Sequence, residues 1–139
     1  MTTQANDGMK LIPPHGGTLV NGYAEKEQVQ ALREEAKSLP SVVINPRQLS
    51  DAHMIVQGAF SPLQGFMGHE DYNAVVKDMH LANGQPWPLP VTLAVNSHQA
   101  SELKEGKQVA LIQQGGEIAG VLSLEGKFRC EKEVEVLAV

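Results

Sequence analysis

The amino-acid sequence predicts an α+β fold, with helices in the N-terminal half and later strands that curl into a small β-barrel. In the first half, apolar residues recur at helical spacing, whereas from about residue 89 they alternate with other residues, as in a half-buried strand. The chain has 139 residues, of which 42% are hydrophobic. This length and composition fit one domain with a real core and hardly two domains.

Three helices are predicted in the first half of the chain. The first spans 25–39, where apolar residues at helical spacing are surrounded by charged and polar ones. The second spans 51–57, with Ser50 as its N-cap and Gly58 at its end. The third spans about 69–79, with apolar residues on one face.

The predicted strands are short and lie mostly in the second half. A buried strand over 42–44 precedes the second helix, and the alternating pattern begins a further strand at 89–95. Gly115-Gly116 is a hairpin signal. The three remaining predicted strands cover 107–113, 117–124 and 127–138.

Charge and composition exclude several classes of protein. The 11 basic and 16 acidic residues give a net charge of −5, which argues against a nucleic-acid-binding protein, because such proteins need basic patches. The only cysteine, Cys130, allows no intrachain disulfide, so a reducing compartment is expected, with Cys130 as a packing residue. Residues 1–10 are polar and are interpreted as a flexible tail. With no signal-peptide core and no apolar stretch of membrane-spanning length, we expect a soluble cytoplasmic protein without a membrane partner.

Sequence motifs for common chemistries do not occur. The chain contains no phosphate-binding GxxxxGK[ST] loop, no GxGxxG and no GxSxG, and its five histidines form no HxxH or HExxH pair. Zinc is not expected either, because Cys130 has no CxxC partner. The sequence therefore assigns neither a catalytic residue nor a metal site to this chain.

Two residues remain as weak candidates for contact with a small ligand. His15 lies between Pro14 and Gly16-Gly17, and Arg47 follows a short strand. The favoured interpretation of His15 is a turn histidine that hydrogen-bonds the backbone and pins the N-terminal segment. The alternative is that His15 and Arg47 contact an anion or a nucleotide.

An apolar loop follows the second predicted helix. It spans 59–68 and contains Phe60, Phe66 and Met67 among glycines and a proline. The favoured interpretation is that these side chains pack onto the core of the domain, since exposed apolar patches are rare on monomers. A ligand floor or a contact with another domain is left open.

Three segments carry a resemblance to a known family. The most specific is Gly58-Ala59-Phe60-Ser61-Pro62-Leu63-Gln64-Gly65-Phe66-Met67, preceded by Arg47-Gln48-Leu49-Ser50-Asp51 and followed by Asp71-Tyr72. The others are Ile12-Pro13-Pro14-His15-Gly16-Gly17 with Leu19-Val20, and Trp87-Pro88-Leu89-Pro90-Val91-Thr92-Leu93 with Gly120-Val121-Leu122. In order and spacing they resemble the N-terminal domain of the sulfate adenylyltransferases (ATP sulfurylases).

This resemblance implies a PUA-like domain over 11–139. In that family the full enzyme forms adenosine 5′-phosphosulfate and pyrophosphate from ATP and sulfate with Mg²⁺. The chemistry resides in a following nucleotidyltransferase domain, whose Gln-Thr-Arg-Asn-Pro-x-His-x-x-His type motif this chain lacks. The segment is then a structural part of the enzyme, inactive alone and without a cofactor of its own. Its implied partner is the catalytic domain, and homo-oligomerisation is left open.

A competing hypothesis is a stand-alone PUA-like module that binds RNA or a small anion. The acidic charge and the 4% content of aromatic residues argue against RNA.

Overall fold

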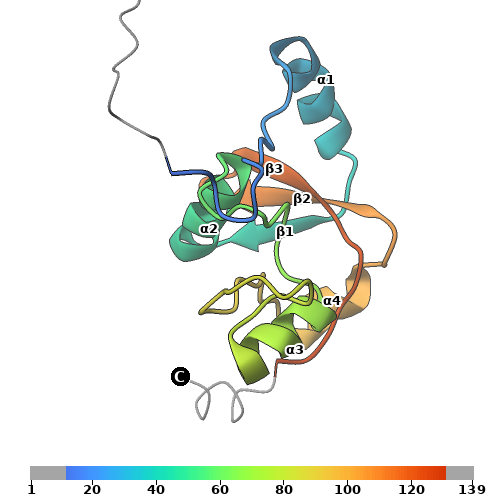
Figure 1. The fold of residues 1–139 in the computed structure, drawn as a ribbon. Helices are drawn as coiled ribbons and strands as arrows, with labels where there is room; N and C mark the ends of the chain where they lie inside the picture. Colours follow the sequence, from blue (N-terminus) through green and yellow to red (C-terminus); the bar gives the residue numbers. More distant parts are fainter. Residues whose placement is uncertain (1–11, 131–139) are drawn as a thin grey trace, which may run out of the picture.

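The structure, a computed structural model, describes residues 12–130, which contain four helices and a three-stranded sheet (Figure 1). In chain order the elements are α1 (Lys26–Ala36), β1 (Ser41–Ile44), α2 (Pro46–Val56), α3 (His69–Asp78), α4 (Ser97–Glu102), β2 (Gln108–Gln113) and β3 (Ile118–Ser123). The α+β prediction is confirmed. Three of these helices precede residue 80 as expected, but α4 lies in the C-terminal half.

The sheet has the order β1-β2-β3. β1 runs parallel to β2, with Val42 opposite Leu111, and β3 runs antiparallel to β2, with Gly120 opposite Leu111. The β2–β3 hairpin turns at Gly116, whose φ of 91° suits glycine. The predicted strands at 42–44, 107–113 and 117–124 therefore form, but the parallel β1–β2 pair joins distant parts of the chain.

The closed barrel that the alternating pattern predicts is not found among residues 12–130. Residues 89–95 form no strand. Two prolines, Pro88 and Pro90, have no amide hydrogen to give to a ladder. The Val91 carbonyl instead accepts a hydrogen bond from the Met67 amide at 2.8 Å, and the Val91 amide faces the Met67 sulfur at 3.4 Å.

The last predicted strand, 127–138, is also corrected in part. Residues 127–130 follow an irregular path, and the rest of that prediction lies outside the described residues. The predicted tail at 1–10 lies outside them too.

The second helix begins earlier than predicted. Its N-cap is Asn45 rather than Ser50, and Ser50 lies inside α2. The Asn45 side chain accepts a hydrogen bond from the Gln48 amide at 2.8 Å, and the Gln48 side chain accepts one from the Asn45 amide at 3.0 Å. Pro46 then occupies the first turn, where its missing N–H costs nothing. The Asn-Pro-x-Gln string was the available sequence signal.

Sequence reasoning missed α4. Its N-cap is Asn96, which forms the same reciprocal pair with Gln99. The helix has only six residues, which is too short to show a helical period. It also lies in the half of the chain that the alternation pattern predicts to be mostly strand.

Two clusters of buried apolar residues form the core. The sheet cluster lies between the sheet and α2. It consists of Val42, Ile44, Leu103, Val109 and Leu111. The loop cluster joins α2, α3 and the loops around them, and consists of Ile55, Leu63, Met67, Val75, Leu81 and Val91. Phe66 packs against both clusters. In Figure 1 the sheet and α2 lie above α3 and the 80–90 loop, and α1 projects from the far end.

Candidate functional site

His15 lies in the turn of the N-terminal segment and reaches across to the 86–90 stretch. Its Nε2 atom is 2.8 Å from the Pro86 carbonyl oxygen, and its ring centroid is 6.0 Å from that of Trp87 at 47°. The turn is closed by the Gly17 amide, which donates to the Pro14 carbonyl at 2.8 Å. This geometry agrees with a histidine that pins the N-terminal segment. A ligand contact for His15 stays a prediction.

The apolar loop 59–68 packs onto the domain itself. Leu63 and Met67 are 6% and 5% exposed, and Phe60 meets Trp87 edge to face with ring centroids 5.9 Å apart. The prediction of an internal cover is confirmed for Phe60, Phe66 and Met67, which all pack within the core clusters. The loop is therefore part of the core and offers no open ligand floor at them.

The N-terminal segment crosses this loop at very close range. The Ser61 hydroxyl accepts a hydrogen bond from the Val20 amide at 2.9 Å and donates one to the Gly58 carbonyl at 2.6 Å. The Gly22 amide donates to the Val56 carbonyl at 2.8 Å. A Cβ atom at Gly58 would lie 2.4 Å from the Val20 carbonyl oxygen. Only glycine allows the two backbones to pass here.

Arg47 lies elsewhere. It is exposed in the first turn of α2, whereas the segment that carries His15 contacts the last turn at Val56. The eleven residues of α2 separate these ends by roughly 16 Å. Within residues 12–130 no hydrogen bond or ion pair reaches the Arg47 guanidinium. Among residues 12–130, no hydrogen bond, ion pair or ring contact joins His15 to Arg47.

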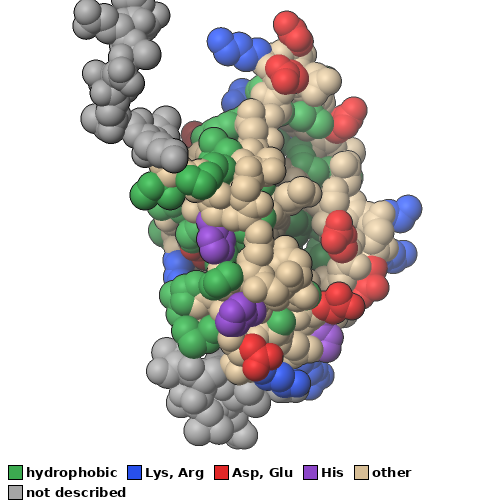
Figure 2. Space-filling view, in the orientation of Figure 1, with side chains coloured by type: hydrophobic (Ala, Val, Ile, Leu, Met, Phe, Trp, Pro, Cys, Tyr) green, Lys and Arg blue, Asp and Glu red, His purple; other side chains and the backbone are tan. Residues whose placement is uncertain are grey.

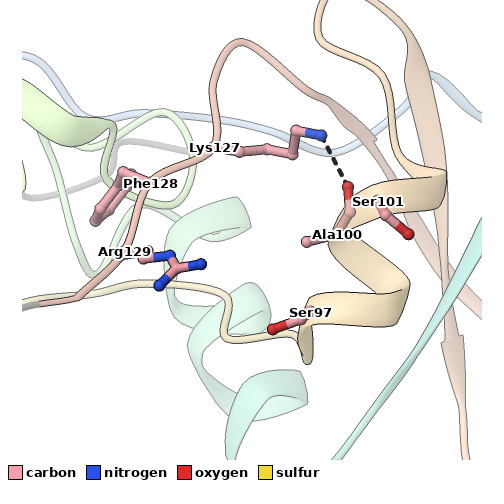
Figure 3. A pocket seen from close by; sticks show the side chains of 6 residues that line it. All are labelled: Ser97, Ala100, Ser101, Lys127, Phe128 and Arg129. Carbon is pink, nitrogen blue, oxygen red and sulfur yellow. Dashed lines mark hydrogen bonds between the residues drawn. The ribbon is translucent and has the colours of Figure 1, made fainter.

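A shallow pocket of about 300 Å³ lies between α4 and the last described residues (Figure 3). Its lining consists of Ser97, Ala100, Ser101, Lys127, Phe128 and Arg129. The Lys127 ammonium donates to the carbonyls of Ala100 at 2.8 Å and Leu103 at 2.7 Å. It therefore satisfies free carbonyls at the end of α4 with two of its three N–H donors.

The other two pocket residues of this stretch point in different directions. Figure 3 shows Arg129 reaching into the pocket and Phe128 turning away from it. Phe128 stacks on His69 with centroids 5.1 Å apart and meets Tyr72 at 5.0 Å. Cys130 is exposed, so its predicted packing role is wrong. One exposed guanidinium beside serine hydroxyls can attract an anion but provides neither a nucleophile–base pair nor an acid–base pair.

Among residues 12–130 no three His, Cys, Asp or Glu side chains gather. Across the same residues no helix has the length and apolar character needed to cross a membrane.

Comparison with known proteins identifies the domain. The chain matches the PUA-like domain family over residues 12–139. It belongs to that family. For the described residues, the PUA-like domain here comprises the open three-stranded sheet and its helices.

The relatives of this PUA-like domain include sulfate adenylyltransferases. It is 51% identical over 128 residues to a sulfate adenylyltransferase of Synechococcus sp. (strain JA-3-3Ab), a match that covers 92% of this chain and 33% of the relative. It is 46% identical to a probable bifunctional SAT/APS kinase 2 of Sorangium cellulosum, covering 93% of this chain and 22% of the relative. The resemblance to sulfate adenylyltransferases is thereby confirmed.

A solved structure is also similar. The hexameric APS kinase from Thiobacillus denitrificans superposes with a TM-score of 0.77 at 34% sequence identity, covering 88% of this chain and 24% of that one. The PUA-like domain thus spans a third or less of the length of these proteins.

Proposed function

We propose that this PUA-like domain is the N-terminal segment of a sulfate adenylyltransferase, which forms adenosine 5′-phosphosulfate and pyrophosphate from ATP and sulfate. The observation that supports this proposal most directly is the 51% identity over 128 residues to the Synechococcus enzyme. The segment is structural: it braces the catalytic domain and performs no chemistry alone.

The described residues support a structural role. His15, Lys127 and Phe128 are engaged in contacts within the domain. ATP and Mg²⁺ belong to the following catalytic domain in this proposal, and no residue of the segment is assigned to either. His15 and Arg47 stay candidates for an anion contact only.

The proposed partners follow from the same assignment. They are the catalytic domain of the same polypeptide and further copies of the enzyme, since the similar solved structure is a hexameric one. The proposed compartment is the cytoplasm. An RNA-binding module is not favoured, because the net charge is −5.

A chimera tests the proposal. The matched third of the Synechococcus enzyme is replaced by this chain, and pyrophosphate release from ATP, sulfate and Mg²⁺ is measured. We expect activity within about tenfold of the parent, a change in barrier of at most about 1.4 kcal/mol, and no turnover by the 139-residue chain.

Two results would contradict the proposal. The first is a folded chimera without activity. The second is turnover by the 139-residue chain at roughly 1 per second or more, a rate typical of enzymes. Calorimetry of the chain with sulfate, ATP and a short RNA tests the binding-module alternative.

A further inference from the structure

Charged residues are distributed very unevenly along the chain. The stretches 12–24, 52–69 and 79–101 contain no Asp, Glu, Lys or Arg, so all 11 basic and 16 acidic residues lie outside them. Charged side chains are normally spread over the surface of a soluble domain. Three long uncharged stretches in one small domain therefore call for a physical reason.

The fold brings these three stretches together. The first meets the second where the Gly22 amide donates to the Val56 carbonyl at 2.8 Å. The second meets the third where the Met67 amide donates to the Val91 carbonyl at 2.8 Å. The first meets the third through His15, whose Nε2 is 2.8 Å from the Pro86 carbonyl oxygen. Their exposed surfaces are called the uncharged face below.

The uncharged face also carries most of the exposed apolar side chains. Among residues 12–130, eight large hydrophobic residues are exposed, and only Val43 and Val121 lie outside the three stretches. The six within them are Ile12, Leu19, Tyr23, Met54, Met79 and Leu89. In Figure 2 hydrophobic side chains gather along the left of the view, whereas most of the charged ones lie on α1, on the right and at the bottom. A surface that combines exposed apolar groups with an absence of Asp, Glu, Lys and Arg is typical of a permanent protein interface.

We infer that the uncharged face docks against the catalytic part of the enzyme, the polypeptide that follows this domain; the inference rests on the proposed function. The relatives are about three times as long as the matched segment, which covers 33% of the Synechococcus enzyme. Phe128 contacts the face itself, because it stacks on His69 of the 52–69 stretch and meets Tyr72 of α3.

Two exposed leucines allow a direct test with a matched control. Leu19 and Leu89 are 64% and 56% exposed, and Val43, outside the face, is 55% exposed. The double variant Leu19→Lys/Leu89→Lys and the control Val43→Lys are each made in the 139-residue chain and in the chimera with the Synechococcus catalytic part. Thermal unfolding and the rate of limited proteolysis are measured in all of them.

The double variant is expected to destabilise the chimera much more than the 139-residue chain. In the 139-residue chain the double variant shifts Tm by no more than about 2 °C, since surface substitutions change stability little. In the chimera it lowers Tm by about 5 °C or more and speeds cleavage at the domain junction, because lysines are forced into a buried apolar contact. Val43→Lys lowers the Tm of the chimera by no more than it lowers the Tm of the 139-residue chain.

Two outcomes overturn the inference. One is an equal Tm shift in the chimera from the double variant and from Val43→Lys. The other is a dimer of the 139-residue chain, seen by light scattering, that the double variant dissociates, because the occupant would then be a second copy. A chimera that lacks activity but shows the specific Tm shift contradicts the proposed function and leaves the docking inference standing.

If the chimera does not fold, the catalytic part is supplied as a separate polypeptide. Calorimetry then measures its binding to the 139-residue chain. Binding that Leu19→Lys/Leu89→Lys weakens at least tenfold supports the inference, and absence of binding overturns it.

Discussion

The sheet cluster and the loop cluster are buried to similar extents but are held in place by different means. In the sheet cluster, Val42 and Leu111 are aligned by the β1–β2 backbone ladder. In the loop cluster, Leu63 and Val91 lie on irregular backbone. That backbone is positioned by single contacts, such as Ser61 with Val20 and Met67 with Val91. Regular hydrogen bonding tolerates many sequences, whereas individual contacts require particular residues.

This difference explains where the resemblance to the sulfate adenylyltransferases is most specific. The longest matching string runs from Gly58 to Met67, in the loop cluster. Gly58 has a φ of 88° with no space for a side chain, and Ser61 is buried and hydrogen-bonded. Gly58 and Ser61 therefore have local physical requirements that a sheet position does not have.

The largest expected effect tests whether the two clusters form one cooperative unit. Leu111 and Leu63 have matched exposures of 5% and 6%. We expect Leu111→Ala and Leu63→Ala each to lower the free energy of unfolding by about 2–5 kcal/mol, because each leaves a cavity. Urea unfolding followed by circular dichroism and by Trp87 fluorescence should give coincident transitions, since Phe66 links the clusters. Separate transitions in Leu63→Ala would show that the loop cluster unfolds on its own.

The next effect isolates the close backbone approach in the loop cluster. Gly58 and Gly116 have φ angles of 88° and 91°, but only at Gly58 would a Cβ meet other atoms within 4 Å. We expect Gly116→Ala to lower the free energy of unfolding by about 1 kcal/mol and Gly58→Ala to lower it by about 3 kcal/mol. Both substitutions place alanine at a positive φ, but only Gly58→Ala also adds a steric clash. Thermal unfolding measures both. Equal costs would mean that the Val20 segment moves aside freely.

A smaller effect concerns the two helix caps. We expect Asn45→Ala to cost about 1 kcal/mol and Asn96→Ala about 0.5 kcal/mol. The reason is that Asn45 positions Gln48, whose side-chain amide also donates to the Ala94 carbonyl at 2.9 Å. Asn45→Asp should retain most of the stability in urea unfolding. A larger loss from Asn96→Ala than from Asn45→Ala would contradict this ranking.

The smallest effect distinguishes a pinning histidine from a surface one. His15→Ala should cost about 0.5–1 kcal/mol, the value of one hydrogen bond. His98→Ala should stay within about 0.3 kcal/mol, because the His98 and Glu102 side chains are 82% and 66% exposed. Hydrogen exchange should also become faster at the Gly17 amide in His15→Ala alone. Unchanged exchange there would exclude the pinning role.

The sequence by itself determined most of the regular elements. α1, α3, β1 and the β2–β3 hairpin follow from local periods and turn residues such as Gly116, because amphipathic period and backbone freedom are encoded within a few neighbouring residues. The resemblance to sulfate adenylyltransferases was also readable, since its strings are contiguous. The start of α2 at Asn45 is readable too, from the capping box that Asn45 forms with Gln48.

Only the tertiary structure decided which alternating stretch forms a strand. Both 89–95 and 117–124 are predicted strands, but β3 has a ladder partner in β2, whereas Val91 is bonded to Met67 across a loop. The parallel pairing of β1 with β2, the contact of His15 with Pro86 and the assembly of the uncharged face all join residues far apart in the chain. Local sequence carries no record of such partners, because the free energy that selects them comes from burying side chains contributed by several segments at once.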